Sequence, residues 1–183
     1  VTAAGATVSP GDACLVVTTG TPTLAKAFTI ASIGDGGSTP LVFTLTNSGT
    51  NPAQSGIAFT DSLPGSLRFT SAAPTVTFGA GCAGANLVTQ GAPDTIAFTG
   101  VSMSNGTASC TITVNGVTNR AAQTNASCAT NPAAFTNGAA NISALANLTN
   151  GVANSCLVVT AGAPTVAKTF GVGTIADGAT TTL

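Results

Sequence analysis

The first residue with a candidate chemical role is a lysine on the apolar side of a predicted strand. Successive side chains of a strand point to opposite faces, so in "LAKAFTI" Lys26 shares its face with Leu24, Phe28 and Ile30. Lysine and arginine together number only four in the 183 residues. A buried charge is costly unless a partner neutralises it. We therefore expect Lys26 to meet buried polar partners from other strands.

Two further polar residues have the same inward placement. Asp61, in "IAFTDSL", shares its face with Phe59 and the other apolar residues of that strand. Asn137, in "AAFTN", has the same parity as Phe135 and is expected to point inward as well. Three buried polar groups from three strands are tolerable only if they satisfy one another. The sequence therefore predicts that Lys26, Asp61 and Asn137 meet in the core.

Such a group of residues has two chemical interpretations. The first is a buried Lys26–Asp61 ion pair with Asn137 as a hydrogen-bond partner. The second is an intramolecular isopeptide bond, because the three residues resemble those of immunoglobulin-like domains of bacterial pili. Burial lowers the pKa of a lysine and raises that of an aspartate. A neutral amine would then attack the Asn137 side-chain carbonyl while protonated Asp61 polarises it, and the loss of ammonia would remove about 17 Da.

Other site chemistry is disfavoured by the composition. The absence of histidine excludes Ser/His and Cys/His nucleophiles and a Cys/His zinc site. The carboxylates are five scattered aspartates, and Asp12, Asp35 and Asp94 lack the spacing of a calcium loop. The "GDGG" stretch has no following helix and lysine that would make it a phosphate loop. We expect no enzyme activity, no metal and no cofactor.

Five cysteines indicate disulfides, and disulfides indicate a location outside the cytoplasm, at the cell surface or in the extracellular space. Cys82 and Cys110 are 28 residues apart, as are Cys128 and Cys156, and we expect each pair to form a bond within one repeat. Cys14 is left over, so an inter-repeat or intermolecular disulfide is expected for it. The net charge of −1, without a basic run, disfavours nucleic-acid binding. No apolar stretch is long enough to span a membrane.

The two ends of the chain repeat one another. Residues 12–41 and 154–183 align without a gap at an offset of 142, and 16 of the 30 positions are identical. Lys26 and Lys168 are equivalent, as are Cys14 and Cys156. We therefore expect a tandem array in which residues 1–20 end one repeat and form the linker, residues 21–160 form a complete repeat, and residues 161–183 begin the next. The alternative is a subunit whose tail donates strands to a neighbour.

Alternating short apolar runs separated by turn signals predict an all-β fold, an immunoglobulin-like β-sandwich with a long excursion between about residues 115 and 154. Only "NISALANLTNG" is a candidate for a short helical turn, and its asparagine content argues against it. The expected strands are Leu24–Ile30, Leu41–Asn47, Ile57–Leu63, Leu67–Thr70, Thr75–Phe78, Thr95–Thr99, Ser109–Val114 and Cys156–Thr160.

Several motifs resemble those of a known family. "PTLAKAF", "LVFTLTN", "FTDSLPGSL" and "AFTN" are similar to a bacterial cell-surface repeat known as domain of unknown function eleven, over nearly the whole 142-residue period. The resemblance implies immunoglobulin-like sandwiches strung in tandem in long cell-surface or secreted proteins, without a known enzyme activity. The loop at 115–134 and the pair Cys128/Cys156 depart from the common pattern.

Together these observations predict a structural repeat unit of an extracellular filament, stalk or sheath, whose partners are copies of itself. Low charge, tandem repeats and disulfides suit a rod that must persist outside the cell. The alternative is the stalk or binding domain of a surface adhesin, with binding activity elsewhere in the chain or in the 115–154 excursion. The sequence identifies no glycan or surface ligand.

Overall fold

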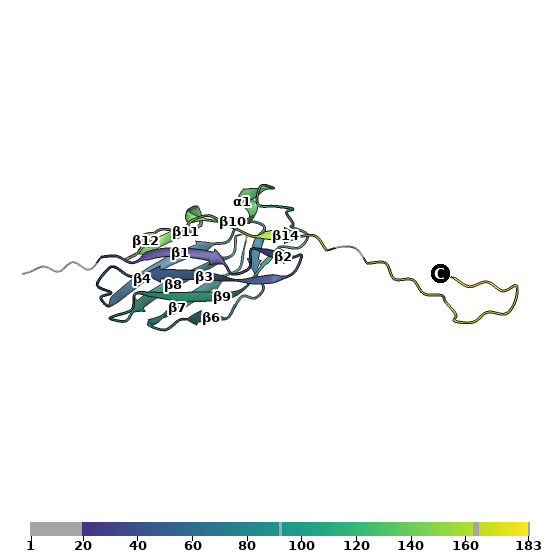
Figure 1. The fold of residues 1–183 in the computed structure, drawn as a ribbon, viewed down its shortest axis with the longest axis horizontal. Helices are drawn as coiled ribbons and strands as arrows, with labels where there is room; N and C mark the ends of the chain where they lie inside the picture. The colour runs from purple at the N-terminus through teal and green to yellow at the C-terminus, as the bar shows by residue number, and fades with distance from the viewer. Residues whose placement is uncertain (1–19, 92, 163–164, 183) are drawn as a thin grey trace, which may run out of the picture.

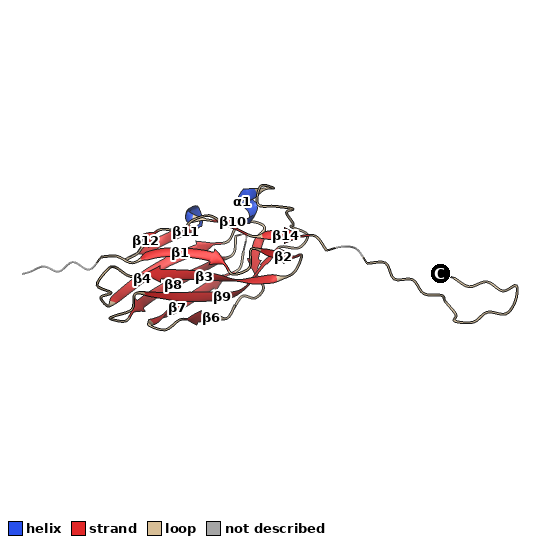
Figure 2. Cartoon of the chain, in the orientation of Figure 1, coloured by secondary structure: helices blue, strands red, loops and turns tan. Residues whose placement is uncertain are grey.

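The computed structural model describes residues 20–91, 93–162 and 165–182. Strands and loops make up nearly all of this part of the chain, and the expected all-β, immunoglobulin-like sandwich is confirmed (Figure 2). The elements are β1 (Thr23–Phe28), β2 (Ser32–Gly34), β3 (Ser38–Thr46), β4 (Gln54–Ser62), β5 (Leu67–Phe69), β6 (Val76–Phe78), β7 (Cys82–Thr89), β8 (Thr95–Met103), β9 (Ser109–Asn119), α1 (Pro132–Phe135), β10 (Thr136–Asn137), a 3-10 turn η1 (Ala139–Asn141), β11 (Ile142–Ala146), β12 (Thr149–Asn150), β13 (Ser155–Cys156) and β14 (Val158–Thr160).

Two sheets form the sandwich. The first has the strand order β12-β1-β3-β9-β5, with β6 also pairing with β9, and the second has the order β11-β4-β8-β7. Two short pairs, β10 with β13 and β14 with β2, lie outside these sheets. Strand β1 runs antiparallel to β3 with Lys26 opposite Phe43, and only its first residues pair with β12. Most of the outer edge of β1 is therefore not paired with β12, and other late segments of the chain contact it there.

The core lies between the two sheets and follows the alternation of the sequence. Leu41, Phe43 and Leu45 of β3 are fully buried, as their parity predicts. The ring of Phe43, in the first sheet, lies 5.2 and 5.4 Å from the rings of Phe59 and Phe98 in the second. Tilted aromatic contacts at this separation are favourable, and here they join the two sheets.

The region from 115 to 154 is more ordered than the expected excursion. Strand β9 continues to Asn119, and the chain then returns to both sheets, because β11 pairs with β4 and β12 pairs with β1. The argument against a helical turn within "NISALANLTNG" is confirmed, because that stretch is mostly strand, β11 and β12. The short α-helix lies earlier, at α1, where Pro132 occupies the first turn. The excursion thus supplies the strands that close one side of the sandwich.

Other differences from the expected strands are local. Ile30 lies beyond the end of β1 and is half exposed, so its expected inward placement was wrong. Strand β2 was not expected, and neither was β7, whose side chains are mostly exposed. A strand with little burial has no clear apolar alternation, which is why "CAGANLVT" gave no strand signal.

The described chain enters and leaves the sandwich at opposite ends of its long axis (Figure 1). It enters at residue 20, before β1, and leaves after Thr160, at the end of β14. Residues 165–182 carry no strand and run away from the sandwich, with Val166 94% and Phe170 62% exposed. No helix among the described residues has the length and apolar character needed to cross a bilayer.

Candidate functional site

The structure brings Lys26, Asp61 and Asn137 together in the core. Lys26 comes from the middle of β1 in the first sheet, Asp61 from the end of β4 in the second, and Asn137 from the short strand β10. Asp61 and Asn137 are fully buried, and Lys26 is 6% exposed. The polar cluster, as we call these three residues, therefore spans the two sheets and a late segment of the chain.

The polar cluster is a closed triangle of hydrogen bonds. The Lys26 Nζ donates to Asp61 Oδ1 and also to Asn137 Oδ1, the latter at 2.5 Å. The Asn137 Nδ2 donates to Asp61 Oδ2 at 2.8 Å. Among the described residues, no buried side-chain nitrogen or oxygen lacks a partner. The carboxyl group thus contacts both the amine and the amide nitrogen, one with each oxygen.

The surroundings of the cluster change its acid–base behaviour. Burial lowers the pKa of Lys26 below its ordinary value of 10.5, against the opposing attraction of Asp61. Burial also raises the pKa of Asp61 above 3.8, against the opposing effects of Lys26 and Asn137. Both shifts favour uncharged groups, because a dry interior disfavours charge. The cluster therefore favours a neutral amine beside a protonated carboxyl group.

Local pairings hold each member in place. Asp61 lies opposite Ile142 in the β4–β11 ladder, and Asn137 lies opposite Ser155 in the β10–β13 pair. The Ser155 Oγ accepts a hydrogen bond from the backbone N–H of Phe28 at 3.2 Å, which ties β13 to the edge of β1. No sequence pattern marks Ser155, since a lone serine after an asparagine-rich loop has no distinctive spacing.

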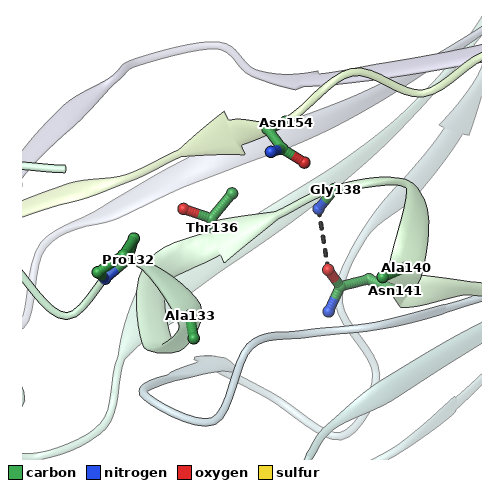
Figure 3. A pocket seen from close by; sticks show the side chains of 7 residues that line it. All are labelled: Pro132, Ala133, Thr136, Gly138, Ala140, Asn141 and Asn154. Atoms are coloured by element: carbon green, nitrogen blue, oxygen red, sulfur yellow. Dashed lines mark hydrogen bonds between the residues drawn. The ribbon is translucent and has the colours of Figure 1, made fainter. Parts of the chain in front are cut away.

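A hollow lies along β10 and the turn that follows it, among residues 132–154 (Figure 3). It measures about 430 Å³, and Thr136 and Gly138, the two neighbours of Asn137, are among its lining residues. The backbone N–H of Gly138 donates to Asn141 Oδ1 at 2.9 Å. A Cβ on Gly138 would lie 2.1 Å from Asn154 Oδ1, so a larger residue here would displace the Asn154 side chain. The other lining residues are Pro132, Ala133, Ala140, Asn141 and Asn154.

Two disulfides are present, in the expected pairings. Cys82 of β7 bonds to Cys110 of β9, so this disulfide joins the edge strand of the second sheet to the first sheet. Cys128, in the loop before α1, bonds to Cys156 of β13, four residues before the end of β14. The Cα atoms are 5.9 Å apart in both. Cys14 lies outside the described residues.

The other aspartates of the sandwich serve local structure. Asp94 is almost fully buried and accepts bonds from the backbone N–H groups of Phe69 and Gly91 and from the Arg120 guanidinium at 2.8 Å. Asp35 accepts from Asn119 Nδ2. In the part of the chain that the structure describes, no three acidic or cysteine side chains are grouped as metal ligands would be.

Comparisons with known proteins place the chain in a family without an assigned function. The seventh ScaB type I cohesin from Pseudobacteroides cellulosolvens is a similar solved structure, with 11% identity, coverage of 80% of this chain and 98% of its own, and a TM-score of 0.41. No curated protein matches the sequence. The family model that matches residues 22–159 differs from the one that the motifs suggested. The chain belongs to the family described as domain of unknown function (DUF7933).

Proposed function

We propose that this chain is a structural repeat unit of an extracellular filament, stalk or sheath that carries tension along its length. The supporting observation is that the chain enters and leaves the sandwich at opposite ends, with cross-linking residues close to both points (Figure 1). Lys26 lies three residues into β1, and the Cys128–Cys156 disulfide lies four residues before the end of β14. Cross-links near the ends of a unit limit the length of chain that can unfold under tension.

The disulfides favour an extracellular location, because such bonds persist where the environment is oxidising. They fasten the two sheets to one another and the loop before α1 to β13. A covalent bond between Lys26 and Asn137 would add a third fastening, between the first strand and a late one. No enzymatic reaction is needed in this role.

The array itself is proposed from the internal repeat. Val166 and Phe170 are exposed, whereas their repeat equivalents Leu24 and Phe28 are buried in the sandwich. An exposed copy of β1 is consistent with residues 161–183 forming the first strands of a following unit, and Lys168 would then take the place of Lys26 there. Strand donation to another copy of the chain is the alternative use of the same segment.

Immunogold electron microscopy of the source cells tests this role, with antibodies raised against residues 21–160. We expect gold at regular intervals along an external fibre or sheath. A second specimen, treated with a reducing agent, serves to test whether the disulfides contribute to the integrity of the fibre. Label confined to the cell interior would contradict the proposal.

A binding role in an adhesin is the second candidate, and the hollow along β10 is the observation that favours it. The hollow is built from the 115–154 region that the sequence suggested for binding, and it offers the exposed amide side chain of Asn154 (Figure 3). A glycan array probed with the full chain tests this role. Binding that is lost in Asn154→Ala and retained in Asn105→Ala, an exposed asparagine far from the hollow in sequence, would support it.

A further inference from the structure

We infer that the folded chain joins Lys26 to Asn137 by an intramolecular isopeptide bond and that Asp61 transfers the protons. The inference rests on the polar cluster and does not require the chain to be part of a filament. Neighbouring residues on the same strand faces, Leu24 and Phe59, are buried, so the reacting groups lie in a dry interior. Lys26 and Asn137 are 111 residues apart in the sequence, and the fold alone brings them together.

The amine is in direct contact with the amide that it would attack. The Lys26 Nζ lies 2.5 Å from Asn137 Oδ1, in contact with the side-chain carbonyl group. A lysine is a nucleophile only when its amine is neutral, and burial lowers the pKa of Lys26 toward that form. The second requirement is an acid that protonates the leaving nitrogen. The two Asp61 oxygens contact the two nitrogens and not the carbonyl oxygen, so Asp61 is placed for this step and not for the polarisation that the sequence suggested.

Asp61 meets the second requirement through its two oxygens. Oδ1 accepts a hydrogen bond from the amine, and Oδ2 accepts one from the amide nitrogen at 2.8 Å. As the new bond forms between Lys26 Nζ and Asn137 Cγ, Oδ1 takes a proton from Nζ while the carboxyl group gives a proton to Nδ2. The Cγ–Nδ2 bond then breaks, and ammonia leaves.

The reaction balances without another reagent. A primary amine and a primary amide give a secondary amide and ammonia, nothing is oxidised or reduced, and Asp61 returns to its protonated state. The chain acts once on itself.

The buried ion pair is the competing account, and mass spectrometry of the full chain separates the two. The folded, purified chain is reduced, denatured and weighed, and we expect a mass about 17 Da below that of the sequence. A succinimide at an Asn–Gly sequence would cause the same loss, and Asn137 precedes Gly138. The deciding measurement is therefore the tryptic map, in which a cross-link joins the peptide carrying Lys26 to the one carrying Asn137 and protects Lys26 from cleavage.

Matched variants complete the test. Asn137→Ala and Lys26→Met should lose the cross-linked peptide, whereas Lys168→Met should retain it, because Lys168 is exposed in the tail. Asp61→Asn should slow or abolish the cross-link while keeping nearly the same side-chain shape. Separate, unmodified peptides from the folded wild-type chain would overturn the inference, and this result does not depend on any variant folding.

Discussion

Lys26 of β1 and Asn137 of β10 are held 2.5 Å apart, nitrogen to oxygen, across 111 residues of sequence. Asp61 of β4 contacts both of them. One small cluster therefore connects the first strand of the domain, the second sheet and the segment that precedes the exit of the chain. The predictions below follow from this connection and from the two disulfides.

The first prediction concerns how far the unit extends under force when its disulfides are intact and Lys26 is not cross-linked. The shortest covalent route from Lys26 to Cys156 then follows the 56 residues to Cys82 and the disulfide to Cys110. It continues along the 18 residues to Cys128 and through the second disulfide to Cys156. When fully extended, these 74 residues have a length of about 250 Å.

The isopeptide bond shortens that route. From Asn137, only nine residues lead back to Cys128, so about 30 Å remains. Single-molecule pulling of the full chain between handle domains should therefore show a short unfolding step in the wild type and a long one in Asn137→Ala. Lys168→Met should behave as the wild type does. Equal step lengths in the wild type and Asn137→Ala would show that no bond links Lys26 to Asn137.

The second prediction is a bell-shaped dependence of bond formation on pH. The Lys26 amine attacks only above its pKa, and Asp61 donates a proton only below its own. Because burial lowers the pKa of Lys26 from 10.5 and raises that of Asp61 from 3.8, the two reactive forms overlap more than they would in solvent, at a pH between these two values. Acid protonates the amine and alkali ionises the carboxyl group, so the rate falls on both sides.

Refolding at a series of pH values measures this dependence. The chain is recovered unfolded, diluted into native buffer and sampled over time for the cross-linked peptide. A rate that increases steadily up to pH 10.5 would indicate an ordinary, solvated lysine and would contradict the role given to burial.

The third prediction concerns the disulfides. Each closes a 28-residue separation, and the chain-entropy estimate for such a loop is about 3.5 kcal/mol. Replacing Cys82 and Cys110 together by alanine should lower the free energy of unfolding by about this amount in urea titrations. The Cys128/Cys156 double variant is the matched comparison, since its loop is equally long. Both are measured in the Asn137→Ala background, so that no other loop changes. A negligible loss in both would contradict the loop-closure explanation.

The fourth prediction concerns Gly138. Its replacement by alanine would place a Cβ 2.1 Å from Asn154 Oδ1, so the Asn154 side chain must rotate away, and a loss of about 1 kcal/mol is expected. Because Gly138 follows Asn137, the cross-link should also form more slowly. Gly162→Ala is the control, as no atom lies within 4 Å of the added Cβ. Thermal melts and the tryptic map measure the two effects, and a Gly138→Ala chain as stable as the control would contradict the steric explanation.

The polar cluster was predictable because its members interrupt otherwise apolar strand faces. In β1 and β4 the alternation alone assigns Lys26 and Asp61 to the core side, and both are buried. Asn137 is buried as well, but the parity argument that placed it was incomplete, because Phe135 ends α1 and does not belong to a strand. Its position is set instead by the pairing of β10 with β13.

Other features depend on contacts that local sequence does not encode. The return of residues 142–150 to both sheets is non-local, and the asparagine-rich stretch gives no periodic signal for it. Nothing in the sequence around Asp94 indicates that it is buried and hydrogen-bonded to Arg120 and two backbone N–H groups. Such partnerships arise from the approach of distant loops, so composition and spacing could not have indicated them.

The short pairing of β14 with β2 has a mechanical consequence. The two strands are parallel, with Val158 beside Ser32 and Thr160 beside Gly34, and the chain leaves the sandwich directly after Thr160. A pull on the exit therefore acts along β14, and a pull on the entry acts along β1 in the opposite direction (Figure 1). Both end strands are loaded in shear, so their hydrogen bonds must break together, whereas a force across the strands would peel them apart one bond at a time.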